Sequence, residues 1–136
     1  MEFDELSSKV IRAALTVHAA LGPGLFEEVY KICLRHELCK ASLKVFSEVG
    51  LPVVYDGVNL DIGYRIDLLV EDSLIVELKA VEQLREVHKA QLLTYLRLAN
   101  KQVGLLFNFN TALLKQQGIV RLVNSYSPFA SFAPSR

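Results

Sequence analysis

The chain has 136 residues, of which 51% are hydrophobic, enough to fill the core of one ordinary domain. Its 15 basic and 15 acidic residues cancel, which argues against tight non-specific binding to nucleic acid, although residues 87–136 contain no acid. No apolar run approaches the roughly 18 residues that span a membrane, and the first residues are too acidic for a signal peptide, so we expect a cytoplasmic protein.

Two helices are expected before any strand. Apolar residues recur at helical spacing from Glu5 to Leu21, and Gly22-Pro23-Gly24 must end that helix. A second helix is expected from Leu25 to about Lys40. Its polar face would present Glu27, Tyr30 and Lys31. Its buried face would present Leu25, Val29, Ile32, Cys33 and His36.

The histidines and cysteines of these helices are not expected to form a site. His18 and His36 lie on apolar helix faces without a second ligand, so we interpret both as satisfied core or boundary histidines. Cys33 and Cys39 lie six residues apart, which does not match the spacing of zinc ligands. We interpret these two side chains as reduced thiols in the core.

The rest of the chain predicts an α/β fold. Three β-rich stretches are expected first, near residues 43–55, 58–70 and 73–81. One helix and two strands then follow, at about Gln83–Asn100, Val103–Asn108 and Gly118–Val123. The order ααβββαββ indicates a mixed sheet of the α+β type covered by helices, because several of these strands are apolar on both faces.

One domain is expected, comprising residues 1–124, and a flexible tail, residues 125–136, rich in Ser, Ala, Pro and Phe. Tyr126, Phe129 and Phe132 are spaced three residues apart in this tail. If the core ends before them, these rings would be exposed unless they pack on the domain or on a second subunit. The second arrangement would produce a homodimer.

Three charged residues interrupt the apolar strands of the second predicted hairpin. Glu77 and Lys79 share one face of a strand, because side chains alternate along it. A three-residue loop at 71–73 would pair Val70 with Leu74, Leu68 with Val76 and Ile66 with Leu78, giving one uniformly apolar face. Asp67 would then lie opposite Glu77 with Cβ atoms about 5 Å apart, where two carboxylates repel unless a cation lies between them.

This pattern predicts a site for Mg²⁺ or Mn²⁺, which prefer oxygen ligands. Asp67 and Glu77 would bind the metal, and the backbone carbonyl of Leu78 between the functional side chains would add a third oxygen. Lys79 would orient or help deprotonate the attacking water and offset charge on a phosphate. An alternative interpretation is a structural ion-pair cluster that only closes the end of a strand pair.

Two further polar pairs stand at helical spacing. Gln91 and Tyr95 are one turn apart and need hydrogen-bond partners if they face inward, either from the backbone or from a site. Glu27 and Tyr30 share a face directly after the Gly-Pro-Gly turn. Glu27 would either join the site or stabilise the helix N-terminus.

The segment Gly24-Leu25-Phe26-Glu27-Glu28-Val29-Tyr30 reads Gly-x-x-Glu-x-x-Tyr, and the chain resembles the bacterial and archaeal family named GxxExxY after that signature. The resemblance runs from about Val10 to Asn124. It implies membership of the PD-(D/E)XK superfamily of Mg²⁺-dependent nucleases, with a restriction-endonuclease-like αβββαβ core, an extra N-terminal helix and a site on the central hairpin. Its further blocks are Gly63–Asp67, Ile75–Ala80, Gln91–Tyr95 and Leu106–Asn110.

Carried over by residue, the resemblance implies that Asp67, Glu77 and Lys79 are the catalytic Asp, Glu and Lys. It implies that Glu27 supports the attacking water or a second metal, and that Gln91 and Tyr95 position these groups. Ile66 stands where the superfamily name has proline.

Two functions stay open at this point. The first is a nuclease acting on DNA or RNA, with a second copy or a protein partner supplying specificity. The alternative is a non-catalytic nucleic-acid-binding or protein-interaction module that keeps the nuclease fold. The acid-free last third would supply either a phosphate-facing surface or ordinary solvated charge.

Overall fold

The most apolar stretches of the chain form the middle of a sheet. The computed structural model describes residues 3–125, and within them every residue of the strand Val103–Asn108 is buried. The helices are α1 (Phe3–Leu21), α2 (Glu27–Lys40), α3 (Glu86–Ala99) and α4 (Leu114–Gln117). The strands are β1 (Val45–Gly50), β2 (Val53–Tyr55), β3 (Val58–Leu60), β4 (Arg65–Val70), β5 (Leu74–Lys79), β6 (Val103–Asn108) and β7 (Ile119–Val123).

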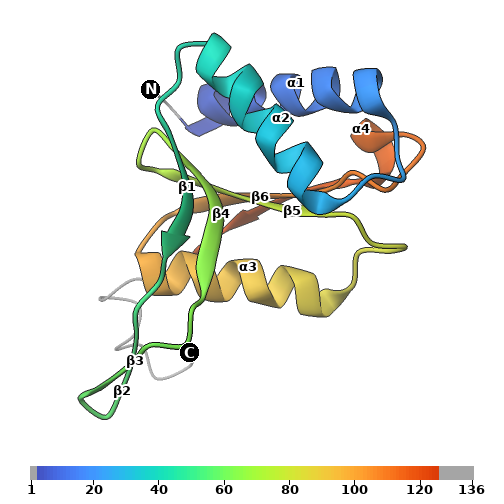
Figure 1. Cartoon of the computed structure of the whole chain (residues 1–136). Helices are drawn as coiled ribbons and strands as arrows, with labels where there is room; N and C mark the ends of the chain where they lie inside the picture. Colours follow the sequence, from blue (N-terminus) through green and yellow to red (C-terminus); the bar gives the residue numbers. More distant parts are fainter. Residues whose placement is uncertain (1–2, 126–136) are drawn as a thin grey trace.

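The sheet has five strands in the order β1-β4-β5-β6-β7. Only β5 and β6 are parallel, and α3 connects them, as a parallel pair requires. Helices α1 and α2 cover one face of the sheet and α3 covers the other (Figure 1). The succession α2-β1-β4-β5-α3-β6 confirms the expected αβββαβ core, and α1 is the extra N-terminal helix.

Both faces of the sheet are packed against helices, and this explains the apolar strands. One cluster fills the space under α1 and α2, with Tyr30, Leu78 and Phe107 among its members. A second cluster joins the sheet to α3. Gly104 in β6 lets α3 approach closely, because a Cβ atom there would lie 2.8 Å from a methyl group of Leu92.

Two of the three predicted β-rich stretches are interrupted. The stretch 43–55 forms β1 and β2, and the stretch 58–70 forms β3 and β4. Pro52, which has no N–H to donate, stands at the first break, and Gly63, with φ +77°, stands near the second. Strands β2 and β3 form a separate two-stranded sheet that projects from the main one (Figure 1). Helix α4 was not predicted.

The predicted buried face of α2 is wrong. Tyr30 is fully buried with Leu34 and Leu38, whereas Ile32 is 60% exposed. Tyr30 was assigned to the polar face because of its hydroxyl group, but that group finds partners inside the protein. The buried residues follow each other at intervals of four and therefore form one stripe along the helix. This stripe, and not the predicted one, packs on the sheet.

The interpretation of His18 is confirmed, because its Nε2 atom lies 2.8 Å from the Thr111 carbonyl oxygen in a buried position. His36 is exposed, so its assignment to the core or its boundary is wrong. Cys33 and Cys39 are both free thiols. Cys33 is half-buried and packs against the core cluster, whereas Cys39 is exposed, so the core assignment is wrong for Cys39. The errors at His36 and Cys39 share one cause, the rotation of α2 about its axis.

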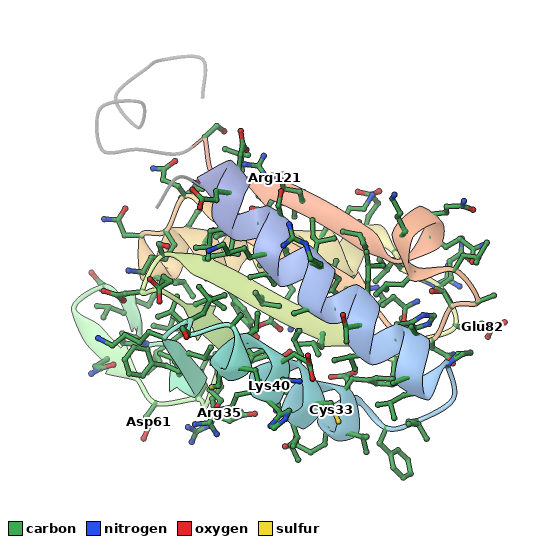
Figure 2. All side chains as sticks on the ribbon, turned by 90° about the horizontal axis from the view of Figure 1, so that it is seen from above. Cys33, Arg35, Lys40, Asp61, Glu82 and Arg121 are labelled. Carbon is green, nitrogen blue, oxygen red and sulfur yellow. The ribbon has the colours of Figure 1, made fainter. Side chains whose placement is uncertain are left out.

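Figure 2, seen from above, shows α1 and α2 side by side over the sheet, with Arg121 of β7 next to α1. The Arg121 guanidinium lies 3.2 Å from the carboxylate of Asp4. No helix within residues 3–125 is both long and apolar enough to cross a membrane. Residues 126–136 of the predicted tail, including Tyr126, Phe129 and Phe132, lie outside the described residues.

Candidate active site at the open end of the β4–β5 hairpin

The predicted register of the central hairpin is confirmed for the two predicted pairs next to the turn, whereas the predicted Ile66–Leu78 pair is not part of the ladder. Val70 pairs with Leu74 and Leu68 pairs with Val76 across a turn of three residues. Residues 71 and 72 of this turn both have φ +53°. The ladder between β4 and β5 ends at the Leu68–Val76 pair, so the next residues along each strand have no ladder partner across the gap. Asp67 and Glu77 are these residues.

Each carboxylate bonds to the strand that carries the other. The backbone N–H of Asp67 donates to Oε1 of Glu77 at 3.0 Å. The backbone N–H of Leu78 donates to Oδ2 of Asp67 at 2.9 Å. Two hydrogen bonds between a side chain and the backbone therefore take the place of the backbone ladder where β4 and β5 separate. The N–H and C=O groups of a strand residue project to the same edge, so the Leu78 carbonyl faces the same gap as Asp67.

The predicted apolar face of the hairpin is only partly correct. Leu68 and Leu78 belong to the cluster under α1 and α2, but Ile66 belongs to the cluster under α3. The alternation of β4 is broken at Asp67, and the β1–β4 ladder skips the same position, where Glu48 of β1 has φ +55°. Ile66 therefore does not share a face with Leu78.

Glu77 is buried beside a second acid. Its side chain comes from the middle of the sheet and is only 4% exposed. Burial raises the pKa of Glu77 well above its usual value, and the charge of Asp67 and a hydrogen bond between the two carboxyl groups add to the rise. The Asp67 N–H and the charge of Lys79 act in the opposite direction but do not cancel it. Without a cation, the buried Glu77 carboxyl group therefore holds its proton more tightly than an exposed glutamate does.

Lys79 is held by α3. Its Nζ atom donates to Oε1 of Gln91 at 2.9 Å. Among the ion pairs of residues 3–125, none joins Lys79 to Asp67 or Glu77. This argues against the interpretation of Asp67, Glu77 and Lys79 as a closed ion-pair cluster, because the lysine of that cluster is bonded elsewhere.

Tyr95 stands on the same side of the sheet. The residue is 5% exposed, and its ring lies 6.2 Å from that of Tyr64, centre to centre. Burial raises the pKa of Tyr95, and the charges of Glu77 and Asp67 raise it further, while a hydrogen bond with Gln91 lowers it. The expectation that Gln91 and Tyr95 face inward and find polar partners is met.

Glu27 reaches the site from the first turn of α2. Its Oε2 atom accepts the backbone N–H of Ala80 at 3.3 Å, directly after β5. The helix begins after Phe26, which makes no side-chain cap. Glu27, Glu28, Lys31, Asp67 and Leu78 line one small cavity of about 30 Å³. Glu27 therefore lies both in the first turn of α2 and beside Asp67, so its position agrees with either of the two expected roles.

Tyr30 determines where α2 begins. Its hydroxyl group donates to the Gly22 carbonyl at 2.6 Å and accepts the N–H of Leu25 at 3.1 Å. Its ring stacks on that of Phe109 at 4.6 Å between ring centres. Gly22 and Gly24 have φ of +68° and +101°, which glycine adopts readily. The Tyr of the Gly-x-x-Glu-x-x-Tyr segment thus fixes the turn that places Glu27.

Sequence reasoning missed Lys31 and Glu48. The Lys31 ammonium lies 3.0 Å from Glu28 Oε1 and 3.9 Å from Asp67 Oδ1, and it also bonds to the Glu48 carboxylate. Burial lowers the pKa of Lys31, but hydrogen bonds to Glu48 and Glu28 and the charge of Asp67 raise it well above its usual value overall. The helical spacing of Glu27 and Lys31 was a usable signal, whereas nothing local indicated Glu48.

Asn108 was also missed as a structural partner of the site. Its side-chain amide bonds to both the N–H and the carbonyl of Val81 at 3.0 Å each. These bonds extend the parallel β5–β6 pairing beyond its last pair, Lys79 with Asn108. The backbone after Lys79 is therefore fixed. A buried Asn at the end of an otherwise apolar strand was the available signal.

The donors fit one divalent metal of the Mg²⁺ type. Within residues 3–125, no three His, Cys, Asp or Glu side chains form a ready-made metal cage. Mg²⁺ does not need one, because it usually keeps several waters and takes one or two carboxylates. Asp67 and Glu77 supply these, and the Leu78 carbonyl faces the same gap. The crowding of two acids, which raises the pKa of Glu77, is the condition that a cation relieves.

A family model described as the PD-(D/E)XK nuclease superfamily matches residues 4–122. The matched segment runs from α1 to β7 and contains every candidate site residue. Comparisons with curated proteins and with solved structures gave no match.

Proposed function

Because the chain belongs to the PD-(D/E)XK nuclease superfamily, we propose that it hydrolyses phosphodiester bonds in DNA or RNA with the help of Mg²⁺ or Mn²⁺. Members of this superfamily are usually hydrolytic nucleases that use divalent metals. Membership alone does not supply an activity, since one fold serves several functions. The proposal therefore depends on the chemistry of the site.

The observation that carries the proposal is the paired carboxylates at the open end of the β4–β5 hairpin. Glu77 is buried, Asp67 lies beside it, and each accepts a backbone N–H from the strand of the other. A structural acid pair would be expected to have its lysine between the carboxylates. Here Lys79 is turned to Gln91, and the ammonium group paired with Asp67, that of Lys31, lies 3.9 Å from Oδ1. Among the ion pairs of residues 3–125, none joins a lysine to Glu77.

Asp67, Glu77 and the Leu78 carbonyl would hold the metal in this proposal, and Glu27 would contribute a further oxygen to it or to its water. When bound, the divalent ion would act as a Lewis acid toward phosphoryl oxygen and lower the pKa of water. The protein contributes a fixed frame for these ligands. The two backbone N–H bonds to the carboxylates prevent them from turning away from each other.

Lys79 would act on the phosphate and on the attacking water. Its ammonium group is held at 2.9 Å from Gln91 Oε1, so its position does not depend on the substrate. A preorganised positive charge stabilises the negative charge that develops on the phosphate during attack. Burial and the nearby charges of Glu77 and Asp67 raise the pKa of Tyr95 above its ordinary value of about 10, so its hydroxyl group would act in the site as a hydrogen-bond donor.

A cleavage assay tests the proposal. Labelled single-stranded DNA, double-stranded DNA, branched DNA and RNA are incubated with the wild type in Mn²⁺, in Mg²⁺ and in EDTA. We expect cleavage of at least one substrate that requires metal and is lost in Asp67→Asn. Binding in EDTA without cleavage in any metal would instead support the non-catalytic module.

A further inference from the structure

Lys31 of α2 places its ammonium group among three carboxylates from three elements. It contacts Glu28 of α2 at 3.0 Å, bonds to Glu48 of β1, and lies 3.9 Å from Oδ1 of Asp67 in β4. Its side chain is only 13% exposed, unlike that of a typical surface lysine. The group thus belongs to the interior edge of the site, next to the carboxylate proposed to bind metal.

The backbone of β1 is distorted where this cluster forms. Glu48 has φ +55°, a left-handed conformation in the middle of a strand. A residue other than glycine is strained in this conformation and persists in it where its surroundings fix it. The β1–β4 ladder skips the Glu48–Asp67 position while pairing the residues on either side. The regular pairing of β1 with β4 is therefore interrupted at Glu48, the residue whose carboxylate bonds to Lys31.

The two oxygens of Asp67 have different neighbours. Oδ2 accepts the Leu78 N–H at 2.9 Å, and Oδ1 faces Lys31 at 3.9 Å. Without the lysine, Glu28, Glu48 and Asp67 would form a second acidic group that shares Asp67 with the Asp67–Glu77 pair. Carboxylates arranged in this way suit two divalent ions bridged by a common ligand. The cavity beside Lys31 holds only about 30 Å³, the space of one water molecule.

We propose that Lys31 is a tethered cation that occupies the place of a second divalent ion, so that the site binds one divalent ion and not two. This inference rests on the proposed metal site and specifies its stoichiometry. Lys31 is a positioning residue in this arrangement, because it acts through Asp67. Glu27 then serves the single ion or its water, and the role of a second-metal ligand for Glu27 is not needed.

The test is a Mn²⁺ titration of the full-length protein, followed by electron paramagnetic resonance. We expect one Mn²⁺ per wild-type chain with no coupling between ions. Lys31→Met should bind two Mn²⁺ ions whose spins are coupled, because the vacated carboxylates face a shared Asp67. Lys40→Met is the matched control, since Lys40 ends the same helix (labelled in Figure 2) and, among the ion pairs of the described residues, is paired only with Glu37, at 3.5 Å. It should behave as the wild type.

Each result separates the two proposals. One ion in Lys31→Met, bound with wild-type affinity, would overturn the role of Lys31 and leave the metal site intact. Two ions in the wild type would do the same. No ion in the wild type would overturn the metal site and with it this inference.

If Lys31→Met does not fold, Glu48→Gln provides an independent test. This change removes one negative charge from Lys31 without removing a proposed metal ligand, so the ammonium group would repel the ion more strongly. Mn²⁺ affinity should fall roughly fivefold, the scale of one weak charge pair, while one ion remains bound. Unchanged affinity in Glu48→Gln would overturn the proposal.

Discussion

The backbone N–H of Asp67 donates to the carboxylate of Glu77 at 3.0 Å, so one acid of the hairpin is bonded to the strand that carries the other. Removing the Glu77 side chain would therefore delete a charge and leave a backbone donor without its acceptor. Replacing it with Gln removes the charge and keeps an oxygen in place. Substitutions to the matching amides consequently separate charge from hydrogen bonding at this site, and substitutions to Ala do not.

The stability of the metal-free protein should depend on pH through Glu77. Its pKa is raised in the folded state, so the folded protein holds a proton that the unfolded chain has already released. The stabilisation is complete below the ordinary pKa of Glu and is lost as the pH rises toward the raised value. Measured by differential scanning fluorimetry in EDTA, the Tm of Glu77→Gln minus that of the wild type should increase from pH 5 to pH 8. A difference that does not change with pH would show that Glu77 titrates normally.

Added Mg²⁺ should stabilise the wild type. A ligand that binds only the folded state at 100 times its Kd contributes about 2.7 kcal/mol, which corresponds to a rise in Tm on the order of 10 °C for a domain of this size. Asp67→Asn should lose most of this shift, because the amide is a weaker ligand for Mg²⁺. An equal rise in Tm in the wild type and in Asp67→Asn would show that Mg²⁺ binds at a site that does not include Asp67.

Lys79→Met should retain the fold and lose activity. Lys79 bonds to Gln91 and is in no ion pair of residues 3–125, so the loss of stability should stay within about 1 kcal/mol. Metal affinity should be unchanged or tighter, because a nearby positive charge has gone. The cleavage rate should fall about 10²–10³-fold, as for other preorganised charge stabilisers.

The control for Lys79→Met is Lys89→Met in α3. Among the ion pairs of residues 3–125, Lys89 is paired only with Glu86, at 3.4 Å, and its side chain is 37% exposed. Its cleavage rate should match that of the wild type. A cleavage rate in Lys79→Met equal to that of the wild type would show that Lys79 has no role in cleavage.

Tyr30→Phe should destabilise the protein without changing its ring packing. The change removes the hydroxyl group that bonds to the Gly22 carbonyl and the Leu25 N–H, while the ring can still stack on Phe109. Because both hydrogen bonds are only part-buried, losing each of them should cost about 0.5–1.5 kcal/mol. Chemical denaturation measures the free energy of unfolding of Tyr30→Phe. The control is Tyr55→Phe, since Tyr55 is 74% exposed. Equal stabilities would mean that the hydroxyl group does not hold the turn.

The sequence predicted most of the fold because the strands and helices carry strong local patterns. The apolar strands, the hairpin turn at 71–73 and the long amphipathic helices all follow from spacing along the chain. The register of β4 and β5 also followed as far as the Leu68–Val76 pair, since only a three-residue turn gives that pairing. The positions of Gln91 and Tyr95 followed from helical spacing.

The remaining features depend on contacts between distant parts of the chain. The buried side of α2 was assigned wrongly because the partners of the Tyr30 hydroxyl group are backbone groups of the preceding turn. The place of Ile66 depends on the break in alternation opposite Glu48, which no local pattern reveals. Lys31 joins the site only because α2 and β1 bring it to Glu48 and Asp67. The types of residue along the chain do not show that these distant side chains meet at one place.

Glu77→Gln, measured for metal-free melting and for Mg²⁺-dependent cleavage in the same preparation, tests the metal site most directly. The amide is neutral without having to take up a proton beside Asp67, and it keeps an acceptor for the Asp67 N–H, so the Tm in EDTA at pH 8 should rise by about 2–5 °C. Cleavage by the variant should be lost while the wild type cleaves its substrate. A lower Tm for Glu77→Gln, together with no metal-dependent cleavage by the wild type, would show that the hairpin carboxylates are scaffolding.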